Sequence, residues 1–313
     1  MTFTRIVRIH DYGGPEELVQ ETVNRPNPGD DEILVQVKGI GINPIDWKLR
    51  KGFAKERIPL PLPVALGTEI SGEVVSGGAN VSQFHSGDEV VAMLGLYGAY
   101  ADYVVLKASL AAPKPESITH LEAASIPLAS LTAWQGLIEN AEIQAGQKVL
   151  IHAGAGSVGA FAIQLAANVG ATVATTASSK NHEYVRGLGA DIVIDYQAQN
   201  FESELSDMDV VIDLVGGEVT AKSLNVLKPG GILVQLVPSP EPIAELAEER
   251  GVRAMYMTAS ADGDQLRKLT SLVENGILKT NVGQVFPLSD VVGAQNLSEQ
   301  GQSFGKIVID CEG

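Results

Sequence analysis

The segment Val149–Gly159 constrains the fold of this chain more than any other part of the sequence. An apolar, strand-like run is followed at once by a turn with Gly154, Gly156 and Gly159, and then by a helix-like stretch. The first glycine permits a tight turn, the second lets backbone approach a pyrophosphate, and the third lets the helix pack on the strand. A helix that begins here also offers free N–H groups and a favourable dipole to an anion. A tight connection with no ligand is the alternative explanation.

The sequence around this turn alternates between strands and helices. We expect strands at 148–152, 171–175, 191–194, 210–214 and 232–237, with helices at 158–168 and 181–188 between them. Such alternation predicts a parallel, doubly wound sheet with crossover helices, which is an α/β fold. In that context the glycine-rich turn predicts a dinucleotide site made by Gly154, Ala155, Gly156, Ser157, Val158 and Gly159. His152 is expected to be a packed strand residue.

The two ends of the chain have a different sequence pattern from the middle. Short β-like runs broken by Gly and Pro fill the first 120 residues, and similar runs return after Val282. Regular short strands predict a compact, barrel-like β domain. We therefore predict one domain from residues 1–122 plus 277–313 and a dinucleotide-binding domain at 123–276, which the helix Asp264–Glu274 would close.

The end of the second strand of the parallel sheet indicates which dinucleotide binds. Sites for NAD usually place Asp or Glu about 20 residues past the turn, on the ribose hydroxyls. Here the segment Ala174–Lys180 contains no carboxylate but has Ser178, Ser179 and Lys180. Hydroxyls and an ammonium favour a 2′-phosphate, so the sequence predicts NADPH. Ser178 and Ser179 could instead cap the next helix, and one geometry allows both roles.

Composition excludes several classes of function. The formal net charge of −16 disfavours a nucleic-acid partner, because such binding needs Lys and Arg to neutralise phosphates. No apolar run approaches the length of a transmembrane helix, so we expect no membrane association. Met1–His10 does not resemble a signal peptide, which predicts a cytoplasmic location. The single cysteine, Cys311, excludes a disulfide within one chain.

Several motifs in a fixed order give the chain a resemblance to a known family. They include a Gly-Ile-Asn-Pro segment at 41–44, Leu-Gly-Thr-Glu at 66–69, Ser-Gly-Asp at 86–88, Leu-Thr-Ala-Trp at 131–134 and Gly-Lys-Ile-Val at 305–308. With the glycine-rich turn, they resemble the zinc-less, quinone oxidoreductase-like branch of the medium-chain dehydrogenase/reductase superfamily. The resemblance implies a GroES-like domain formed by both ends of the chain, an inserted Rossmann domain, a substrate cleft between the two, and a homodimer.

The same resemblance assigns further residues of the site. Asn43 and Thr132 match positions that line the nicotinamide, and we take them as the candidate catalytic residues. Tyr196 matches a tyrosine that frames the 2′-phosphate with Lys180 and the serines. The strand-end residues expected along the ribose and nicotinamide are Leu214, Leu236 and Val237. Each of three residues also has a purely structural alternative: Asn43 could shape a turn, Thr132 could cap a helix, and Tyr196 could be an ordinary aromatic residue at a strand end.

Zinc-dependent relatives carry ligands that this sequence lacks. Asn43 stands where the first Cys ligand is usual, and Thr68 stands where the His of a Gly-His-Glu motif is usual. The five histidines are scattered without ligand spacing, so we expect no metal. Some relatives also have a basic cofactor contact near the C-terminus. Residues 301–304 contain none, and Lys306 is the nearest cation.

The resemblance implies hydride transfer from NADPH to an acceptor that needs no metal. A quinone and the β-carbon of an α,β-unsaturated carbonyl both meet this requirement, and the sequence does not choose between them. Positioning would supply much of the rate, with the proton taken from solvent or a hydroxyl group. The alternative hypothesis is an NADPH-binding redox sensor or structural protein with little turnover.

Overall fold

The computed structural model describes residues 3–301 and 303–313, so Met1, Thr2 and Gln302 lie outside the described residues. The chain divides into two compact units. Unit 1 is Met1–Leu128 with Ser260–Gly313, and unit 2 is Ala129–Ala259. The division has the predicted form, an inserted unit between two chain ends, but unit 2 is shorter at both ends than the predicted range 123–276.

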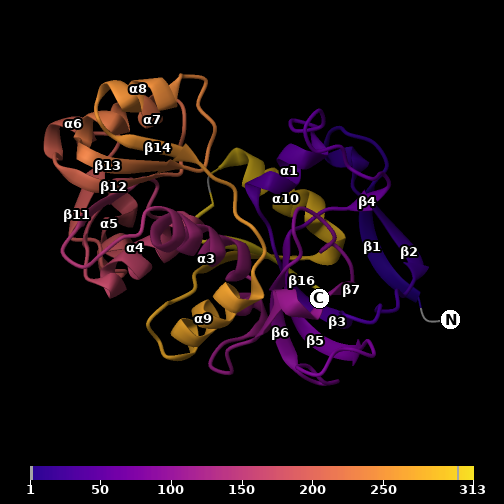
Figure 1. The fold of residues 1–313 in the computed structure, drawn as a ribbon. Helices are drawn as coiled ribbons and strands as arrows, with labels where there is room; N and C mark the ends of the chain where they lie inside the picture. Colours follow the sequence, from indigo (N-terminus) through magenta and orange to yellow (C-terminus); the bar gives the residue numbers. More distant parts are fainter. Residues whose placement is uncertain (1–2, 302) are drawn as a thin grey trace. The chain divides into compact units, whose positions relative to one another are not determined.

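Unit 2 is built around a six-stranded parallel sheet in the order β11-β10-β9-β12-β13-β14. Strands β12, β13 and β14 lie side by side in Figure 1. Its strands are β9 (Lys148–Ile151), β10 (Thr172–Ala177), β11 (Ile192–Asp195), β12 (Met208–Asp213), β13 (Leu227–Gln235) and β14 (Arg253–Tyr256). In chain order this is 3-2-1-4-5-6, the doubly wound Rossmann arrangement with its switch point between the first and fourth strands. The predicted α/β fold is confirmed, while β14 is a strand that the sequence pattern did not reveal.

Helices cover this sheet because the crossovers between parallel strands must bury its apolar faces. They are α4 (Ser157–Val169), α5 (His182–Gly187), α6 (Phe201–Glu204), α7 (Glu218–Ser223) and α8 (Ile243–Glu249), with short 3₁₀ turns at Ser179–Asn181 and Leu224–Val226. Helix α4 packs on β9 and β10. Eight of its thirteen residues are buried, and Gly170, in the left-handed conformation, ends it.

Unit 1 contains a seven-stranded sheet in the order β15-β16-β3-β5-β6-β8, with β7 also paired to β3. Its strands are β3 (Glu32–Gly41), β5 (Glu69–Gly77), β6 (Glu89–Met93), β7 (Tyr103–Lys107), β8 (Ala111–Pro113), β15 (Val282–Pro287) and β16 (Lys306–Asp310). A smaller sheet has the order β2-β1-β4, from Val19–Asn24, Phe3–Ile9 and Val64–Ala65. Strands from both chain ends therefore form one sheet, as the sequence predicted.

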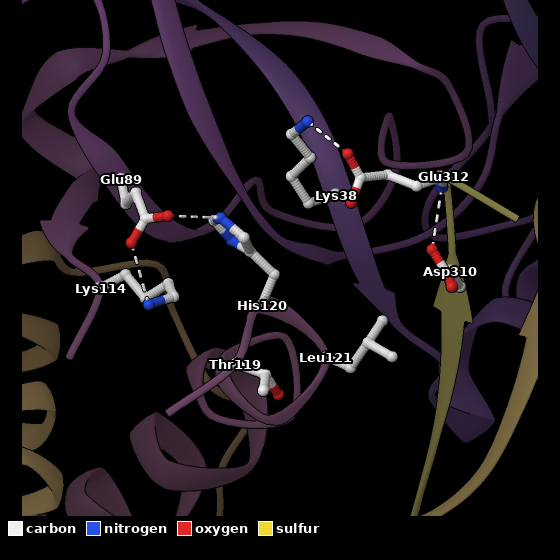
Figure 2. A pocket seen from close by; sticks show the side chains of 8 residues that line it. All are labelled: Lys38, Glu89, Lys114, Thr119, His120, Leu121, Asp310 and Glu312. Atoms are coloured by element: carbon white, nitrogen blue, oxygen red, sulfur yellow. Dashed lines mark hydrogen bonds and ion pairs between the residues drawn. The ribbon is translucent and has the colours of Figure 1, made fainter. Parts of the chain in front are cut away.

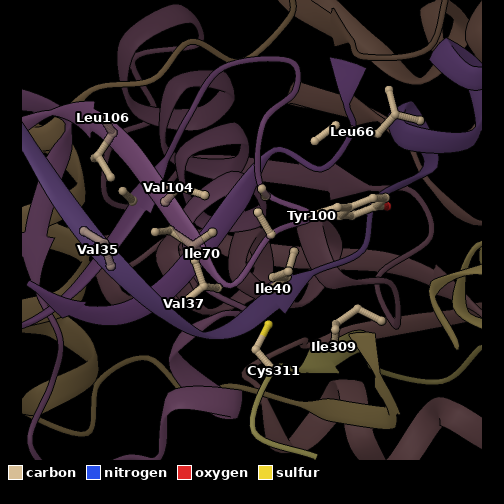
Figure 3. Close-up of a cluster of buried hydrophobic side chains, with 14 of the residues drawn as sticks. Val35, Val37, Ile40, Leu66, Ile70, Tyr100, Val104, Leu106, Ile309 and Cys311 are labelled. Atoms are coloured by element: carbon tan, nitrogen blue, oxygen red, sulfur yellow. The ribbon is translucent and has the colours of Figure 1, made fainter. Parts of the chain in front are cut away.

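The core of unit 1 fills the space enclosed by these strands (Figure 3). Ile40, Ile70 and Ile309 come from three neighbouring strands and are fully buried, and Tyr100 lies among them. Cys311 lies beside Ile309 in the same cluster. Burial raises the pKa of its thiol far above the usual range.

Helices complete unit 1, and one of them corrects an expectation. They are α1 (Pro44–Arg50), α2 (His120–Ala123), α9 (Gly263–Glu274) and α10 (Val291–Gln300), with 3₁₀ turns at Pro15–Glu17, Ala108–Leu110 and Leu288–Asp290. Helix α9 was expected to close the parallel sheet, but it packs on β8 of unit 1 instead. Gly263 makes this possible, since a Cβ there would stand 2.1 Å from the carbonyl oxygen of Ser109.

One helix, α3 (Pro127–Trp134), carries the chain across the boundary at Leu128 and continues as a π-helical segment at Gln135–Asn140. Within the described ranges, none of the helices has both the length and the apolar character needed to cross a membrane.

Candidate functional site

The turn after β9, residues Ala153–Gly159, is called the glycine turn below. Its left-handed residue is Ala153, with φ 53°, rather than the first glycine. Gly154 is required for a different reason, because a Cβ there would lie 2.0 Å from Oγ1 of Thr175. At Gly159 a Cβ would meet the Ala153 carbonyl oxygen at 2.4 Å. The first and third glycines thus allow close packing of the turn against β10 and of α4 against the turn.

Gly156 differs from Gly154 and Gly159 because a Cβ there would have only one close neighbour and no severe overlap. The nearest atom to a Cβ there would be the Ala153 carbonyl oxygen at 3.3 Å, and Gly156 is exposed. It is the N-cap of α4 and has no side chain to satisfy the helix N–H groups. The first helical hydrogen bond is donated by Ala160 to Gly156, so the N–H groups of residues 157–159 precede it. This arrangement fits an anion such as a pyrophosphate.

Thr176 of β10 holds the glycine turn in place. The Ala153 N–H donates to Oγ1 of Thr176 over 3.1 Å, and the Gly154 N–H donates to the Thr176 carbonyl over 3.0 Å. His152 is buried, with Nδ1 3.2 Å from Oγ1 of Thr176 and Nε2 2.9 Å from Oγ of Ser223. Desolvation lowers the pKa of His152, so the ring is neutral. The prediction that His152 is a packed residue is confirmed.

The predicted 2′-phosphate residues lie just past β10 and β11. Ser178 is largely buried, whereas Ser179 and Lys180 are exposed on the following 3₁₀ turn. Ser178 is the N-cap of that turn, but its side chain makes no capping hydrogen bond, so the capping alternative lacks a contact. Tyr196 follows β11 and is 61% exposed. All four residues follow the carboxyl ends of neighbouring parallel strands, where ligands of such sheets bind.

The remaining predicted cofactor residues follow β12 and β13. Leu214, Leu236 and Val237 are half-buried and lie directly beyond the strand ends. Asp213 shapes the loop after β12, because its buried carboxylate accepts from the N–H groups of Val215 and Gly216 and from Oγ1 of Thr220.

Unit 1 holds a buried group of four polar side chains, Asn43, Thr68, Glu69 and Lys306, called the ion-pair cluster below. The Lys306 ammonium lies 2.5 Å from Oδ1 of Asn43 and 2.6 Å from Oε1 of Glu69. Nδ2 of Asn43 donates to Oε1 of Glu69 over 2.8 Å and to Oγ1 of Thr68 over 2.9 Å. No member is more than 5% exposed: Asn43 and Lys306 are at 3%, and Thr68 and Glu69 at 0%.

The second carboxylate oxygen of Glu69 reaches helix α3. Oε2 accepts from the Leu128 N–H over 2.6 Å, in the first turn of that helix. Thr132 lies four residues farther along the same helix and is 5% exposed. Thr132 is therefore an interior helix residue, and the alternative that it caps a helix is wrong.

Asn43 begins α1 and is also tied to a buried acid. It is the N-cap of α1, and its N–H donates to Oδ2 of Asp46 over 2.9 Å. The Tyr100 hydroxyl donates to the same oxygen over 3.0 Å. Desolvation raises the pKa of Asp46 to about 7. The turn role of Asn43 and its place in the ion-pair cluster are thus both present.

A separate polar cavity of about 340 Å³ opens on unit 1 (Figure 2). Its lining is charged, but ion pairs join Lys114 to Glu89 over 3.0 Å and Lys38 to Glu312 over 2.6 Å. His120 bridges Glu89 and Ser71 through its two ring nitrogens. Because these charges already have partners and none of the predicted site residues lines it, this cavity is not the candidate site.

Unit 1 has the features of a GroES-like domain, and unit 2 is a Rossmann sheet with an exposed glycine, Gly156, at the start of its first crossover helix. Residues 29–116 match the family described as "Alcohol dehydrogenase GroES-like domain", and residues 188–309 match "Zinc-binding dehydrogenase". The chain belongs to the medium-chain dehydrogenase/reductase superfamily, in its quinone oxidoreductase-like branch.

Three similar proteins illustrate this membership. An Arabidopsis thaliana protein named "NADPH-dependent alkenal/one oxidoreductase, chloroplastic" is 36% identical, over 96% of this chain and 77% of its own length. A Spinacia oleracea "Quinone-oxidoreductase homolog, chloroplastic" is 32% identical over 95% of both chains. The solved quinone oxidoreductase from Coxiella burnetii superposes with a TM-score of 0.90 and 35% identity, covering 99% of both chains.

The residues of the ion-pair cluster do not fit the zinc that one family description implies. Zinc in proteins is held by Cys, His and carboxylate ligands. Of the side chains that bond the Asn43 side chain, only Glu69 is of this kind, and both of its oxygens already accept hydrogen bonds. The Lys306 ammonium, 2.6 Å from Glu69, would also repel a divalent cation.

Sequence reasoning named Asn43 and noted Lys306 but missed the role of Glu69. The available signal was an acid and a base at the starts of two apolar strands, Glu69 in β5 and Lys306 in β16. Those strands lie on either side of β3 in the sheet. Only the sheet order shows that the two charges meet.

Proposed function

We propose that this protein is an NADPH-dependent oxidoreductase that transfers hydride to a quinone or to an α,β-unsaturated carbonyl compound without zinc. The glycine turn carries this proposal, because it offers exposed backbone and a helix N-terminus at the switch point of a Rossmann sheet. Membership of a family of oxidoreductases supports a nicotinamide cofactor, and the names of the relatives support the acceptor class.

The preference for NADPH rests on the end of β10. Ser179 and Lys180 are exposed there, and no carboxylate occurs between Ala174 and Asn181 to repel a 2′-phosphate. Tyr196, exposed beyond β11, would add an aromatic face beside the adenosine. The name of the Arabidopsis relative points the same way.

Each part of the chain would have a defined task. The N–H groups of residues 157–159 would hold the pyrophosphate, and Leu214, Leu236 and Val237 would exclude water along the ribose and nicotinamide. Asn43 and Thr132 would contact the nicotinamide carboxamide and orient it. When bound, the cofactor supplies a hydride, and the acceptor takes up a proton from solvent.

Anaerobic mixing of the protein with NADPH and a panel of quinones and enones tests this function. We expect loss of NADPH absorbance with at least one acceptor class, and a slower hydride transfer when the transferred hydrogen is deuterium. Comparison of quinones with enones then identifies the acceptor class. If NADPH is not oxidised with any member of either class, the proposed enzyme activity is wrong.

An NADPH-binding sensor or structural protein with little turnover is the second candidate. It is favoured by one observation, namely that the polar atoms of Asn43 are bonded inside unit 1 and that its side chain is largely buried. Tight NADPH binding, measured by the change in its fluorescence, without turnover of any acceptor would select this candidate.

The homodimer and the cytoplasmic location are further proposals that rest on the sequence. Light scattering of the purified protein at several concentrations measures the mass in solution. A mass of 33.0 kDa, that of a single chain, at all concentrations would contradict the homodimer.

A further inference from the structure

The ion-pair cluster joins two strands that are not neighbours. Glu69 is on β5 and Lys306 is on β16, with β3 between them. The paired residue of Glu69 on β3 is Gly41, which is paired to Val308 on its other side. A Cβ at Gly41 would stand 2.4 Å from Oε1 of Glu69, so a glycine is needed here to leave room for the carboxylate.

The charges fix the orientation of the Asn43 amide. An ammonium has only donors and a carboxylate has only acceptors, so Oδ1 must face Lys306 and Nδ2 must face Glu69. The reversed amide would place its NH₂ group against the ammonium and its oxygen against the carboxylate. The pair therefore selects one of the two amide orientations.

The same carboxylate also anchors α3. Its Oε2 accepts from the Leu128 N–H, which lies in the first turn of the helix. A negative charge at this end is also favoured by the helix dipole. One side chain thus contacts both Asn43 and the start of the helix that carries Thr132.

We propose that Glu69 and Lys306 form a metal-independent positioning pair, which sets the orientation of the Asn43 amide and the start of α3 and thereby the rate of hydride transfer. This inference rests on the proposed function. Neither residue is assigned a contact with the cofactor or the acceptor, so their effect is exerted through Asn43 and α3.

The test compares single and paired substitutions at these positions. Lys306→Met and Glu69→Gln each leave a buried charge without its partner, so both should lower the thermal midpoint. Glu69→Gln/Lys306→Met removes both charges, so its thermal midpoint should lie above those of the single variants and close to that of the wild type. If the pair served only stability, the double variant would also transfer hydride at the wild-type rate.

We expect the double variant to transfer hydride about 10- to 100-fold more slowly than the wild type in single-turnover experiments, because a small misplacement of a reacting group has effects of this size. The Kd for NADPH should change much less. Asn43→Ala should slow transfer similarly, and adding it to the double variant should cause little further loss. A wild-type rate in the double variant, or fully multiplicative losses, would overturn the proposal.

Two matched controls separate positioning from instability. Ile33→Ala removes a fully buried side chain of β3 and should lower the midpoint without slowing hydride transfer. Glu89→Gln/Lys114→Met removes another lysine–glutamate pair of unit 1 and should also leave the rate unchanged. If the double variant at Glu69 and Lys306 does not fold, Lys306→Met is compared with Ile33→Ala, and equal rates in these two variants would contradict the proposal.

Metal dependence gives an independent readout on the wild type. Treatment with a strong chelator followed by desalting should leave the hydride-transfer rate unchanged, and a loss that added zinc restores would contradict metal independence. The proposed function fails separately, since it requires the wild type itself to oxidise NADPH with some acceptor.

Discussion

The glycine turn of unit 2 and the ion-pair cluster of unit 1 use opposite means to prepare a site. The glycine turn works through backbone, and its one exposed glycine, Gly156, leaves N–H groups accessible. The ion-pair cluster works through four side chains that are at least 95% buried, two of which form an ion pair. A backbone site tolerates local change except where a Cβ collides, whereas a buried charge pair depends on both partners at once.

The largest expected effect concerns the ion-pair cluster. Lys306→Met should destabilise the protein by about 3–5 kcal/mol, because it leaves the Glu69 carboxylate buried without its counter-ion. Glu69→Gln/Lys306→Met should cost far less, since no charge is left alone. Urea denaturation of the three proteins measures the difference. Equal losses in the single and double variants would contradict this prediction, because they would show that the Glu69 carboxylate left without its counter-ion carries no cost.

The glycine turn gives the next effect, and its glycines should separate stability from binding. Gly154→Ala should cost about 1–3 kcal/mol of stability, because the new Cβ would overlap Oγ1 of Thr175. Gly156→Ala should cost less stability than Gly154→Ala but weaken NADPH binding by about 10-fold, since its Cβ would meet only the Ala153 carbonyl oxygen, at 3.3 Å, and would lie at the exposed start of α4 where the phosphates would bind. Thermal melts and fluorescence titrations test both; a reversed pattern would contradict the assigned roles.

Asp46, which accepts a hydrogen bond from the Asn43 N–H, should make the stability of the protein depend on pH. Its pKa is raised by desolvation to about 7 in the folded protein, above that of an unfolded aspartate. Stability from this group is complete below pH 4 and is lost as the pH rises through 7. Asp46→Asn keeps an acceptor for Asn43 and Tyr100, so at pH 8 it should be on the order of 2 kcal/mol more stable than the wild type. A difference that does not grow between pH 4 and pH 8 would contradict this assignment.

The smallest effect on stability is expected at the exposed end of β10. Lys180→Ala should leave the thermal midpoint unchanged, because the side chain is exposed. It should raise the Kd for NADPH by about 10-fold, the equivalent of one lost charge-assisted contact, and raise the Kd for NADH much less. Glu183→Ala, another exposed charge nearby, is the control. Equal losses of affinity for NADPH and NADH would contradict a contact between Lys180 and the 2′-phosphate.

The two regions also differ in how far the sequence predicted them. The parallel sheet and the glycine turn were predicted because a strand, three glycines and a helix are adjacent in the chain. The sequence did not predict that Ala153 takes the left-handed conformation or that Gly154 is needed beside Thr175. That contact depends on the register between β9 and β10.

The ion-pair cluster could not be predicted from spacing, because its members come from three distant segments. Asn43 was found through a family resemblance, but Glu69 and Lys306 meet only because β5 and β16 flank β3. Helix α9 was misplaced for a similar reason. Its position depends on the packing of Gly263 against Ser109, which no local pattern encodes.

The burial of Cys311 has a chemical consequence for the proposed activity. Quinones and enones are electrophiles that alkylate thiolates, and the thiolate rather than the thiol is the nucleophile. The chain has one cysteine, which is 6% exposed among apolar side chains, and its raised pKa keeps it protonated. A protein that handles such compounds therefore presents them with almost no thiolate, which makes it resistant to alkylation by its own substrates.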